Sequence, residues 1–279
     1  MKIVSTVEEL RIALPTNQTI GFVPTMGYLH EGHMSLVENA RRENDVVVMS
    51  IFVNPTQFGP NEDLDRYPRD FERDEKLARD AGVDVLFYPT TETMYPLDMA
   101  RVTVRHGADV LCGASRPGHF DGVLTIVSKL FNLVQPTRAY FGLKDAQQVA
   151  LIEGYVRDYF VPVEIRRCPI IREETGLAKS SRNVYLSDVE TVEASRIFSA
   201  LTMAREALDT GQQVDEVKRQ LTERLNEIPN SQIDYVELVD YPTLGAVSSD
   251  STDSTELLLA VAIQFERARL IDNVIWKKG

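Results

Sequence analysis

The 279-residue sequence has only two cysteines, one tryptophan and four histidines, and it has no long apolar run. Two cysteines, Cys112 and Cys168, cannot form a disulfide framework and are typical of a protein from a reducing cytosol. The longest apolar runs, at residues 46–53 and 257–263, are too short to cross a bilayer. The charged N-terminal segment also lacks the unbroken apolar core of a signal peptide. We therefore expect a soluble, cytoplasmic protein that does not bind membranes.

Basic residues are also in short supply. Lys and Arg together number 30 against 42 Asp and Glu, which gives a formal net charge of −12. A surface this acidic repels nucleic-acid phosphate, so we expect no nucleic-acid partner, although a small anionic substrate can still bind in a locally basic cleft. With 43% apolar and 26% charged residues, the composition is that of a globular protein, and the length suggests about two domains.

The first 170 or so residues alternate between short apolar runs and stretches with helical spacing. The runs predict buried strands at residues 20–23, 46–53, 83–88, 138–142 and 163–171. Helical spacing of apolar side chains is clearest at residues 120–134 and 149–160. Strands and helices in alternation predict an α/β fold with right-handed βαβ crossovers, in which a Rossmann-like, doubly wound parallel sheet forms the core.

The pattern changes after about residue 175. Two helical stretches are followed by three strand-like runs, at residues 197–208, 214–228, 233–239, 257–265 and 270–276. Helices followed by adjacent strands predict a smaller C-terminal α+β domain. We therefore expect one domain over residues 1–175 and a second over residues 176–279. The string GAVSSDSTDST, at residues 245–255, is expected to be a polar surface loop.

Two histidines lie where the first long helix is expected to begin, in the string GFVPTMGYLHEGHMSLVENA. His30 and His33 are three residues apart, so both lie on one face of the first helical turn. They could belong to a solvated helix face, and they could bind zinc, although His106, His119 and the cysteines show no paired ligand spacing. A third interpretation is a nucleotide-phosphate site, because a helix start offers free N–H groups and a positive dipole end. The HEGH string resembles the HIGH signature of adenylate-forming nucleotidyltransferases and synthetases.

A second polar string, REETGLAKSSRNVYLS, follows the predicted sheet. Its consecutive Lys179, Ser180, Ser181 and Arg182 could close as a mobile loop over a triphosphate and offset the charge of a departing pyrophosphate. The alternative is a solvated interdomain linker. Together with the upstream HEGH string, this segment resembles the KMSKS-type loop that accompanies HIGH.

Five strings in order identify the sequence as a member of the pantothenate synthetase (pantoate–β-alanine ligase) family, over nearly its whole length. They are PTMGYLHEGH, FVNPTQF, RPGHFDGV, FGLKDAQQ and SSRNVYL. The sequence departs from the family pattern twice. Leu143 stands where Glu is usual, so a role for an acidic side chain does not carry over. Lys179 stands where Met or Leu is usual, which adds a cation to the expected phosphate loop.

The resemblance implies an ATP-dependent ligase that works in two half-reactions. Pantoate and MgATP would give pantoyl adenylate and pyrophosphate, and β-alanine would then attack the acyl carbon to give pantothenate and AMP. The resemblance also implies a homodimer and a C-terminal domain that acts as a lid on the ATP- and pantoate-binding domain. ATP with Mg2+ is then a substrate, and no tightly bound prosthetic group is expected.

The family's site residues carry over one by one. His33 is the expected acid, and His30, Lys144 and Arg182 are further catalytic contacts to phosphate. The expected ATP-binding residues are Met26, Gly27, Tyr28, Leu29, His30, Glu31, Gly32, His33, Gly142, Leu143, Lys144, Asp145, Ile171, Lys179, Ser180, Ser181 and Arg182. Gln57 and Gln148 are expected to bind pantoate, with Asn54 and Tyr67 in the nearby wall. The sequence identifies no metal ligands, and His119 is expected to bond a backbone carbonyl at a helix start.

Other functions share parts of this pattern. A nucleotidyltransferase that keeps AMP on its product would share the HIGH-like string but would not need FVNPTQF or FGLKDAQQ. An aminoacyl-tRNA synthetase fragment is disfavoured by the acidic charge and by the lack of a tRNA-binding module. A non-catalytic nucleotide-binding module is the third alternative.

Overall fold

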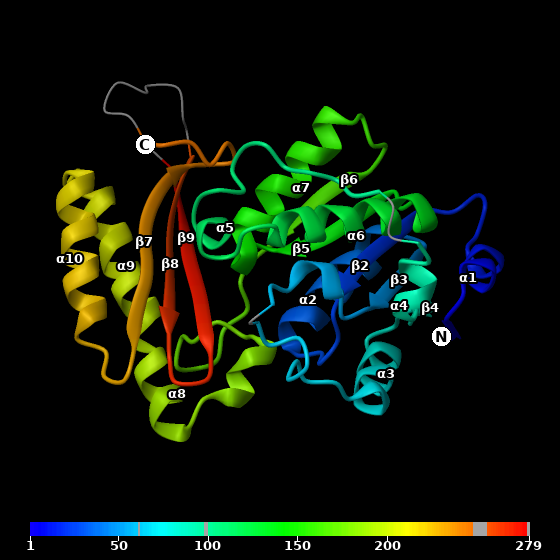
Figure 1. The fold of residues 1–279 in the computed structure, drawn as a ribbon, viewed down its shortest axis with the longest axis horizontal. Coiled ribbons are helices and arrows are strands. Elements are labelled where there is room, and N and C mark those ends of the chain that lie inside the picture. Colours follow the sequence, from blue (N-terminus) through cyan, green and yellow to red (C-terminus); the bar gives the residue numbers. More distant parts are fainter. Residues whose placement is uncertain (61, 98–99, 248–255, 278–279) are drawn as a thin grey trace. The chain divides into compact units, whose positions relative to one another are not determined.

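The computed structural model describes residues 1–60, 62–97, 100–247 and 256–277, which group into two compact units (Figure 1). The first unit comprises Met1–Arg105, Arg116–Leu143 and Leu151–Pro169, and the second comprises His106–Ser115, Lys144–Ala150 and Ile170–Gly279. Two short segments from within residues 1–175 thus pack with the C-terminal part of the chain. The division of roles between residues 1–175 and 176–279 stays a prediction.

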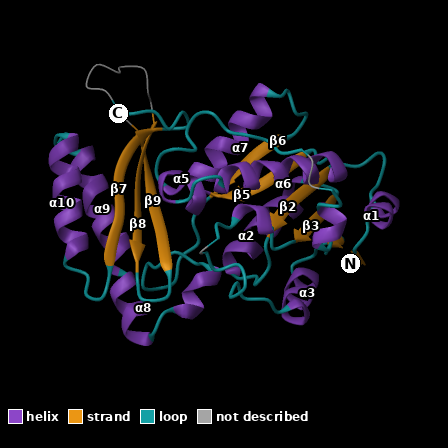
Figure 2. Cartoon of the chain, in the orientation of Figure 1, coloured by secondary structure: helices purple, strands orange, loops and turns teal. Residues whose placement is uncertain are grey.

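The first unit is built on a sheet of six strands in the order β1-β4-β3-β2-β5-β6, and every pairing is parallel. Their bounds are β1 Lys2–Val4, β2 Ile20–Thr25, β3 Val46–Ile51, β4 Val85–Phe87, β5 Arg138–Gly142 and β6 Glu164–Cys168. The chain runs outward from β2 through β3 and then returns to the other side of β2 with β5. This order confirms the predicted doubly wound α/β fold (Figure 2).

Helices cover both faces of this sheet because side chains alternate across each strand. Val23 of β2 packs with Val37 of α2 (Glu31–Glu43) in a core that also includes Ala78 of α3 (Phe71–Asp80). The preceding residue, Phe22, contacts Phe131 of α6 (His119–Val134) in an edge-to-face pair with ring centroids 6.5 Å apart. Helices α1 (Val7–Ala13) and α4 (Thr91–Met94) also belong to the first unit, and so does α7 (Ala146–Asp158) from Leu151 onward.

Strand β6 forms one edge of the sheet and is rich in charge. Arg166 pairs with Glu164 at 2.7 Å, and Arg167 pairs with Glu153 at 2.6 Å. Charged side chains on an edge strand discourage pairing with the edge of another sheet. The central strands, in contrast, are apolar and buried, and Val47, Val48 and Met49 of β3 are fully buried.

The second unit contains a three-stranded antiparallel sheet in the order β7-β8-β9, with bounds Gln232–Asp240, Glu256–Gln264 and Arg269–Lys277. Alternate residues of these strands form a core with helices α9 (Arg196–Asp209) and α10 (Val214–Asn226). Helix α8 (Asp188–Ala194) precedes α9 in the chain, and the short α5 (Cys112–Ser115) belongs to the same unit. The predicted smaller α+β part is confirmed.

The apolar runs predicted most of these elements but not all of them. The strands predicted at residues 46–53, 83–88 and 163–171 are each shorter in the structure, where they span Val46–Ile51, Val85–Phe87 and Glu164–Cys168. Strand β1 and helix α1 were not predicted, since three residues are too few to show a period. Residues 248–255 of the expected polar loop lie outside the described residues. Within the described part of the chain, no helix is both long and apolar enough to span a membrane.

Tyr140 of β5 provides a test of the buried polar contacts beneath α2. Its hydroxyl donates to the Glu43 carboxylate at 2.9 Å and accepts from the Asn44 amide at 2.7 Å. Burial, reinforced by Glu43, raises the pKa of Tyr140 to about 12, from 10.0. Because the unfolded chain then loses this proton first, stability should fall as the pH rises from 10 to 12.

In Tyr140→Phe this loss should be missing, so the difference in unfolding free energy between wild type and variant should shrink across that pH range. Urea denaturation at a series of pH values measures it, with the exposed Tyr159→Phe as the control. Parallel curves for wild type and Tyr140→Phe would contradict the assignment.

Candidate active site

The order of strands in the first unit reverses between β2 and β5. In open parallel sheets, ligands bind outside the carboxyl ends of the strands at such a switch point. Strand β2 ends at Thr25 and is followed by the turn into α2, while β5 ends at Gly142. The structure therefore places the predicted residues 26–33 and Gly142 at the two strand ends that flank the switch point.

The turn between β2 and α2 has a left-handed backbone conformation, which a buried carboxylate stabilises through hydrogen bonds. Gly27 and Tyr28 have φ of 88° and 51°, in the left-handed region. A Cβ on Gly27 would also lie 2.9 Å from Ile51. Asp74 of α3, only 2% exposed, accepts hydrogen bonds from the N–H groups of Tyr28 at 2.6 Å and Leu29 at 2.7 Å. Burial raises the pKa of Asp74, and these two hydrogen bonds oppose that rise.

The two histidines at the start of α2 are held by the backbone in the same way. His30 caps the helix, and its Nδ1 accepts from the N–H of Gly32 at 3.1 Å. The Nδ1 of His33 accepts from the N–H of His30 at 3.3 Å, and the two ring centroids are 4.1 Å apart. A ring nitrogen that accepts a hydrogen bond carries no proton, so each neutral ring has its proton on Nε2. Both rings can therefore donate Nε2–H to an anionic ligand.

Other members of the predicted ATP-binding string differ in what their side chains can reach. Leu29 is fully buried in the core with α2, so only its backbone can contact a ligand. Glu31 is exposed at the first position of α2, and Met26 is half-buried. The sulfur of Met26 lies 3.0 Å from the amide nitrogen of Gln57. One predicted ATP contact and one predicted pantoate contact are thus neighbours in this unit.

Gln57 is 8% exposed and ends a short 3-10 helix, η1 (Pro55–Gln57). Its side-chain oxygen accepts from the amide of Asn54 at 3.0 Å, and the same Asn54 amide donates to the carbonyl of Gly122 on α6 at 3.1 Å. A Cβ on Gly122 would lie 2.3 Å from the carbonyl oxygen of Thr56. Glycine at this position therefore allows α6 to approach η1 closely enough to fix the Gln57 segment.

His119 supports the same segment from the start of α6. Its Nδ1 donates to the carbonyl of Gln57 at 2.7 Å, and its Nε2 lies 3.0 Å from the guanidinium of Arg116. This confirms the expected bond from His119 to a backbone carbonyl at a helix start. Arg116 also pairs with Glu62 at 2.5 Å. Burial opposes ionisation of Glu62, but the bonds and charge of Arg116 lower its pKa overall.

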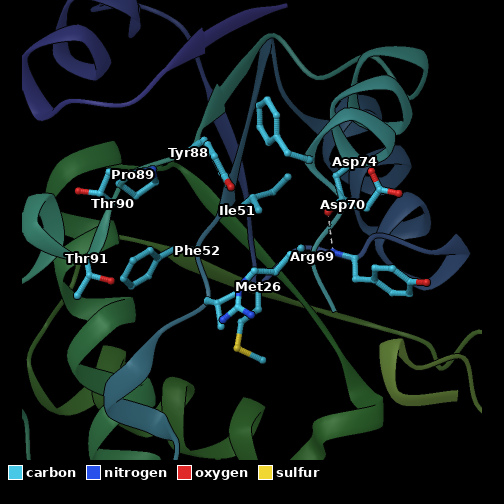
Figure 3. Close-up of a pocket in the computed structure, with 14 residues that line it drawn as sticks. Met26, Ile51, Phe52, Arg69, Asp70, Asp74, Tyr88, Pro89, Thr90 and Thr91 are labelled. Atoms are coloured by element: carbon cyan, nitrogen blue, oxygen red, sulfur yellow. Dashed lines mark hydrogen bonds between the residues drawn. The ribbon is translucent and has the colours of Figure 1, made fainter. Parts of the chain in front are cut away.

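A cavity of about 200 Å³ lies beside this region, at the carboxyl ends of β2, β3 and β4. Met26, Tyr28, Phe52, Arg69 and Tyr88 are among the residues that line it, and Figure 3 shows the lining residues as sticks. The Arg69 guanidinium donates to the carbonyls of Tyr67 and Leu64, both at 3.0 Å, and so orders the segment that precedes α3. Tyr67 is 5% exposed, and its ring makes an edge contact with Phe58, with centroids 6.0 Å apart.

The remaining predicted site residues belong to the second unit. They are Lys144, Asp145, Gln148, Ile171, Lys179, Ser180, Ser181 and Arg182. Leu143, where the family usually has Glu, is the last residue of the first unit before this segment. Lys144 and Asp145 lie in the 3-10 helix η2 (Leu143–Asp145), and Gln148 lies in the first turn of α7. All of these residues but Ser181 are half-buried, and Ser181 is buried.

Residues 171–182 are more ordered than the expected mobile loop. Arg172 and Ala178 form an antiparallel bridge, and Lys179 N–H donates to the carbonyl of Ile171 at 2.9 Å. Ser180 then caps the 3-10 helix η3 (Ser181–Tyr185). The cation that Lys179 adds is paired with Glu173 at 2.6 Å. Its charge is therefore already compensated before any ligand binds.

The environment of Lys144 disfavours the charged form of its amine. Burial lowers the pKa of Lys144, Asp145 opposes that effect, and the positive charge of Arg182 lowers the pKa further. A small pocket of about 10 Å³, close to the size of one water, is lined by Lys144, Asp145 and Tyr235 among others. An anion bound beside both Lys144 and Arg182 would relieve the repulsion between the two cations.

Three supporting residues were not singled out by sequence reasoning. Asp74 lies within the charged string RDFERDE, residues 69–75, in which nothing distinguishes it from its charged neighbours. Gln147 is 4% exposed, and its amide bonds the carbonyls of Gly107 and Val110, both at 2.7 Å, and the N–H of Cys112 at 3.0 Å. Asp272 holds Arg172 through two hydrogen bonds. A buried polar side chain leaves no signal in sequence when its partners are backbone atoms far along the chain.

Both cysteines are free thiols and are buried. Cys112 and Cys168 are 4% and 3% exposed, and burial raises the pKa of Cys168 to about 11. Among the described residues, no group of three or more His, Cys, Asp or Glu side chains could hold a metal ion. The zinc interpretation of His30 and His33 therefore gains no further ligand from the part of the chain that the structure describes.

The sequence matches the family described as pantoate-beta-alanine ligase over residues 2–275. The chain belongs to this family. It is 96% identical over 279 residues, all of both chains, to a protein named pantothenate synthetase from an Exiguobacterium species.

Two solved structures of proteins with the same family names are similar to this chain in both sequence and fold. That of pantothenate synthetase from Thermus thermophilus matches with a TM-score of 0.92 and 52% identity, covering 98% of this chain and 99% of the other. That of pantoate-beta-alanine ligase from Francisella tularensis, complexed with β,γ-ATP and β-alanine, matches with a TM-score of 0.81 and 35% identity, covering 100% and 99%. The family match confirms the resemblance inferred from the five strings.

The close approach of α6 to η1 makes Gly122 a position where this family member should not tolerate a side chain. Gly122→Ala should destabilise the fold by about 1–3 kcal/mol, because the new Cβ overlaps backbone atoms that cannot move aside. Gly154→Ala, in α7, is the matched control: its Cβ meets no atom closer than 3.7 Å, so helix propensity should make it stabilising by up to about 1 kcal/mol. Denaturant unfolding of the two variants measures both, and equal effects would contradict the packing argument.

Proposed function

We propose that this chain catalyses the ATP-dependent condensation of pantoate with β-alanine to pantothenate, with release of AMP and pyrophosphate. The observation that carries the proposal is the pair of histidines at the start of α2, each held through Nδ1 by a backbone N–H at the switch point of the sheet. The family membership and the relatives' names support the choice of substrates.

In the first half-reaction, the pantoate carboxylate attacks the α-phosphorus of ATP, and the bond from that phosphorus to the bridging oxygen of pyrophosphate breaks. Repulsion between the carboxylate and the triphosphate opposes this step, so donors and cations around the phosphates lower its barrier. His33 and His30 donate from Nε2, and the start of α2 adds its positive dipole end. Lys144, Ser180, Ser181 and Arg182 offset the charge that develops on pyrophosphate.

In the second half-reaction, the amine of β-alanine attacks the acyl carbon of pantoyl adenylate, and AMP leaves with the bonding electron pair. The amide forms once the attacking nitrogen has lost its proton. Gln57 and Gln148 are proposed to bind the hydroxyls and carboxylate of pantoate, because amides supply donors and acceptors without adding charge. Asn54 keeps the Gln57 amide oriented through their 3.0 Å hydrogen bond.

We propose that Mg2+ enters as part of the MgATP substrate. Mg2+ usually keeps several waters and is held by one or two carboxylates together with substrate phosphates. Asp145, next to Lys144, and Glu31, next to His30, are carboxylates that adjoin proposed phosphate contacts in the sequence.

Isotope transfer tests the proposed reaction. Pantoate labelled with oxygen-18 in its carboxylate should pass label to AMP once β-alanine is added. Label in inorganic phosphate would indicate an acyl phosphate route instead. A final product that still carries AMP after β-alanine has been added would indicate a nucleotidyltransferase.

A homodimer and a cytoplasmic location also belong to the proposal. The homodimer rests on the family resemblance, and the location rests on the low cysteine content. Sedimentation equilibrium of the purified chain distinguishes a dimer from a monomer.

His33 should be required for adenylation because its Nε2–H is oriented before ATP binds. His33→Ala should slow pantoate-dependent exchange of pyrophosphate into ATP by about 100- to 10,000-fold. The melting temperature should change little, and the exposed His106→Ala is the matched control. Exchange at a near-normal rate in His33→Ala would exclude the assigned role.

Gln57 should affect pantoate rather than ATP. Removing its amide leaves a bound pantoate hydroxyl unpaired, so Gln57→Ala should weaken pantoate use by about 5- to 150-fold in kcat/KM, with KM for ATP nearly unchanged. Steady-state kinetics with each substrate varied in turn measures this, with Gln220→Ala on the exposed face of α10 as the control. A defect that falls on ATP, or equally on all substrates, would place the pantoate pocket elsewhere.

A further inference from the structure

Two adjacent residues in the middle of β9, Asp272 and Asn273, are polar and almost fully buried, each 5% exposed. Successive side chains of a strand point to opposite faces of the sheet. The neighbours of Asp272 on its own face, Leu270 and Val274, pack in the core with α9 and α10. Asn273 therefore points to the other face, where Lys144 and Cys112 lie beside it in the small pocket. Burying a polar side chain costs free energy unless it is hydrogen-bonded, so the partners of these two residues show what they do.

On the face of the sheet that packs against α9 and α10, Asp272 binds Arg172, which begins the hairpin that leads to residues 179–182. Its carboxylate accepts two hydrogen bonds from the guanidinium of Arg172, at 2.6 and 2.9 Å. Arg172 also donates to the carbonyl of Gly176 at 3.1 Å, and its guanidinium lies 3.7 Å from the centroid of the Phe198 ring. A bidentate pair fixes orientation as well as distance. The hairpin that ends at Lys179 is thus attached to β9 at a defined angle.

On the opposite face, Asn273 donates from its side-chain amide to the backbone carbonyl of Lys144 at 3.0 Å. The N–H of Asn273 donates to the carboxylate of Asp272 at 2.8 Å, so the two side chains belong to one hydrogen-bonded network. Two consecutive residues of β9 therefore fix two segments that lie far apart in sequence and each carry a cation.

These two cations repel each other. Burial lowers the pKa of Lys144 and the charge of Arg182 lowers it further, while the carboxylates of Asp145 and Asp272 oppose that change. In the absence of a bound anion, this repulsion opposes the close approach of Lys144 and Arg182. Strand β9 is paired with β8 along its whole length. It can therefore hold both segments at a fixed separation, which removes the cost of bringing the cations together when an anion binds.

We propose that Asp272 and Asn273 are positioning residues that hold the Lys144 segment and the hairpin of residues 171–182 in a fixed arrangement for the triphosphate of ATP. The triphosphate as occupant rests on the proposed function. Neither residue needs to touch the nucleotide, because each acts through the segment that it holds.

Two kinds of variant separate the two halves of this network. Asn273→Ala removes the side-chain bond to the Lys144 carbonyl and leaves the Asp272–Arg172 pair in place. The double variant Arg172→Gln with Asp272→Asn removes both charges together, which avoids leaving one buried charge unpaired. Lys218→Met, which breaks the 2.7 Å ion pair between α10 and Glu237 of β7, is the control from the same unit. Circular dichroism first establishes that each variant is folded.

We expect KM for ATP in pyrophosphate exchange to rise about 5- to 10-fold in Asn273→Ala and in the double variant, with KM for pantoate unchanged. Amide hydrogen exchange should become faster in residues 143–147 for Asn273→Ala and in residues 171–186 for the double variant, but in neither segment for Lys218→Met. A role confined to general stability would lower the melting temperature and the active fraction without this selective change in KM.

The outcomes distinguish this inference from the proposed function. A wild-type chain that makes pantothenate, combined with variants whose KM for ATP and hydrogen exchange are unchanged, would overturn the positioning role and leave the function intact. A wild-type chain that does not bind ATP would overturn both.

Discussion

The turn from β2 into α2 depends on one buried carboxylate. Asp74 accepts the N–H groups of two successive residues, Tyr28 and Leu29, and it lies close to the space that a side chain on Gly27 would need. This contact keeps the chain in a left-handed conformation that places the start of α2 at the switch point. The orientation of His30 and His33 follows from it, because both rings bond to backbone N–H groups of that first turn.

A second constraint of the same kind operates in the C-terminal unit. Here the positioned segments carry the cations Lys144 and Arg182, and the residues that hold these segments are Asp272 and Asn273 of β9. The cost of burying Asp272 is offset by three hydrogen bonds, two from Arg172 and one from the backbone of Asn273. In both units, then, a buried polar side chain holds the segments that carry the candidate site residues.

Much of the fold could be predicted because its signals are local. The β-branched run of β3, the apolar face of α6 and the change of pattern near residue 175 each fall within a short window. Strand β1 could not be predicted, since it has three residues and its pairing with β4 depends on atoms some 80 residues away. The order inside residues 171–182 was missed for a similar reason. A polar, glycine-containing string is typical of a loop, and the backbone pairing of Arg172 with Ala178 and the contacts of Arg172 with Asp272 and Phe198 appear only in the folded chain.

The sequence by itself determined the family and the candidate substrate-binding residues, because both depend on short contiguous motifs. It also determined the α/β and α+β classes, because the apolar patterns of strands and helices are local. It could not determine which nitrogen of each histidine carries the proton, that Leu29 is a core residue, or that the charge of Lys179 is balanced by Glu173. Nor could it indicate the roles of Asp74, Gln147 and Asp272. Each of these facts depends on a hydrogen bond, an ion pair or a packing contact between side-chain and backbone atoms whose positions are fixed only when the chain has folded.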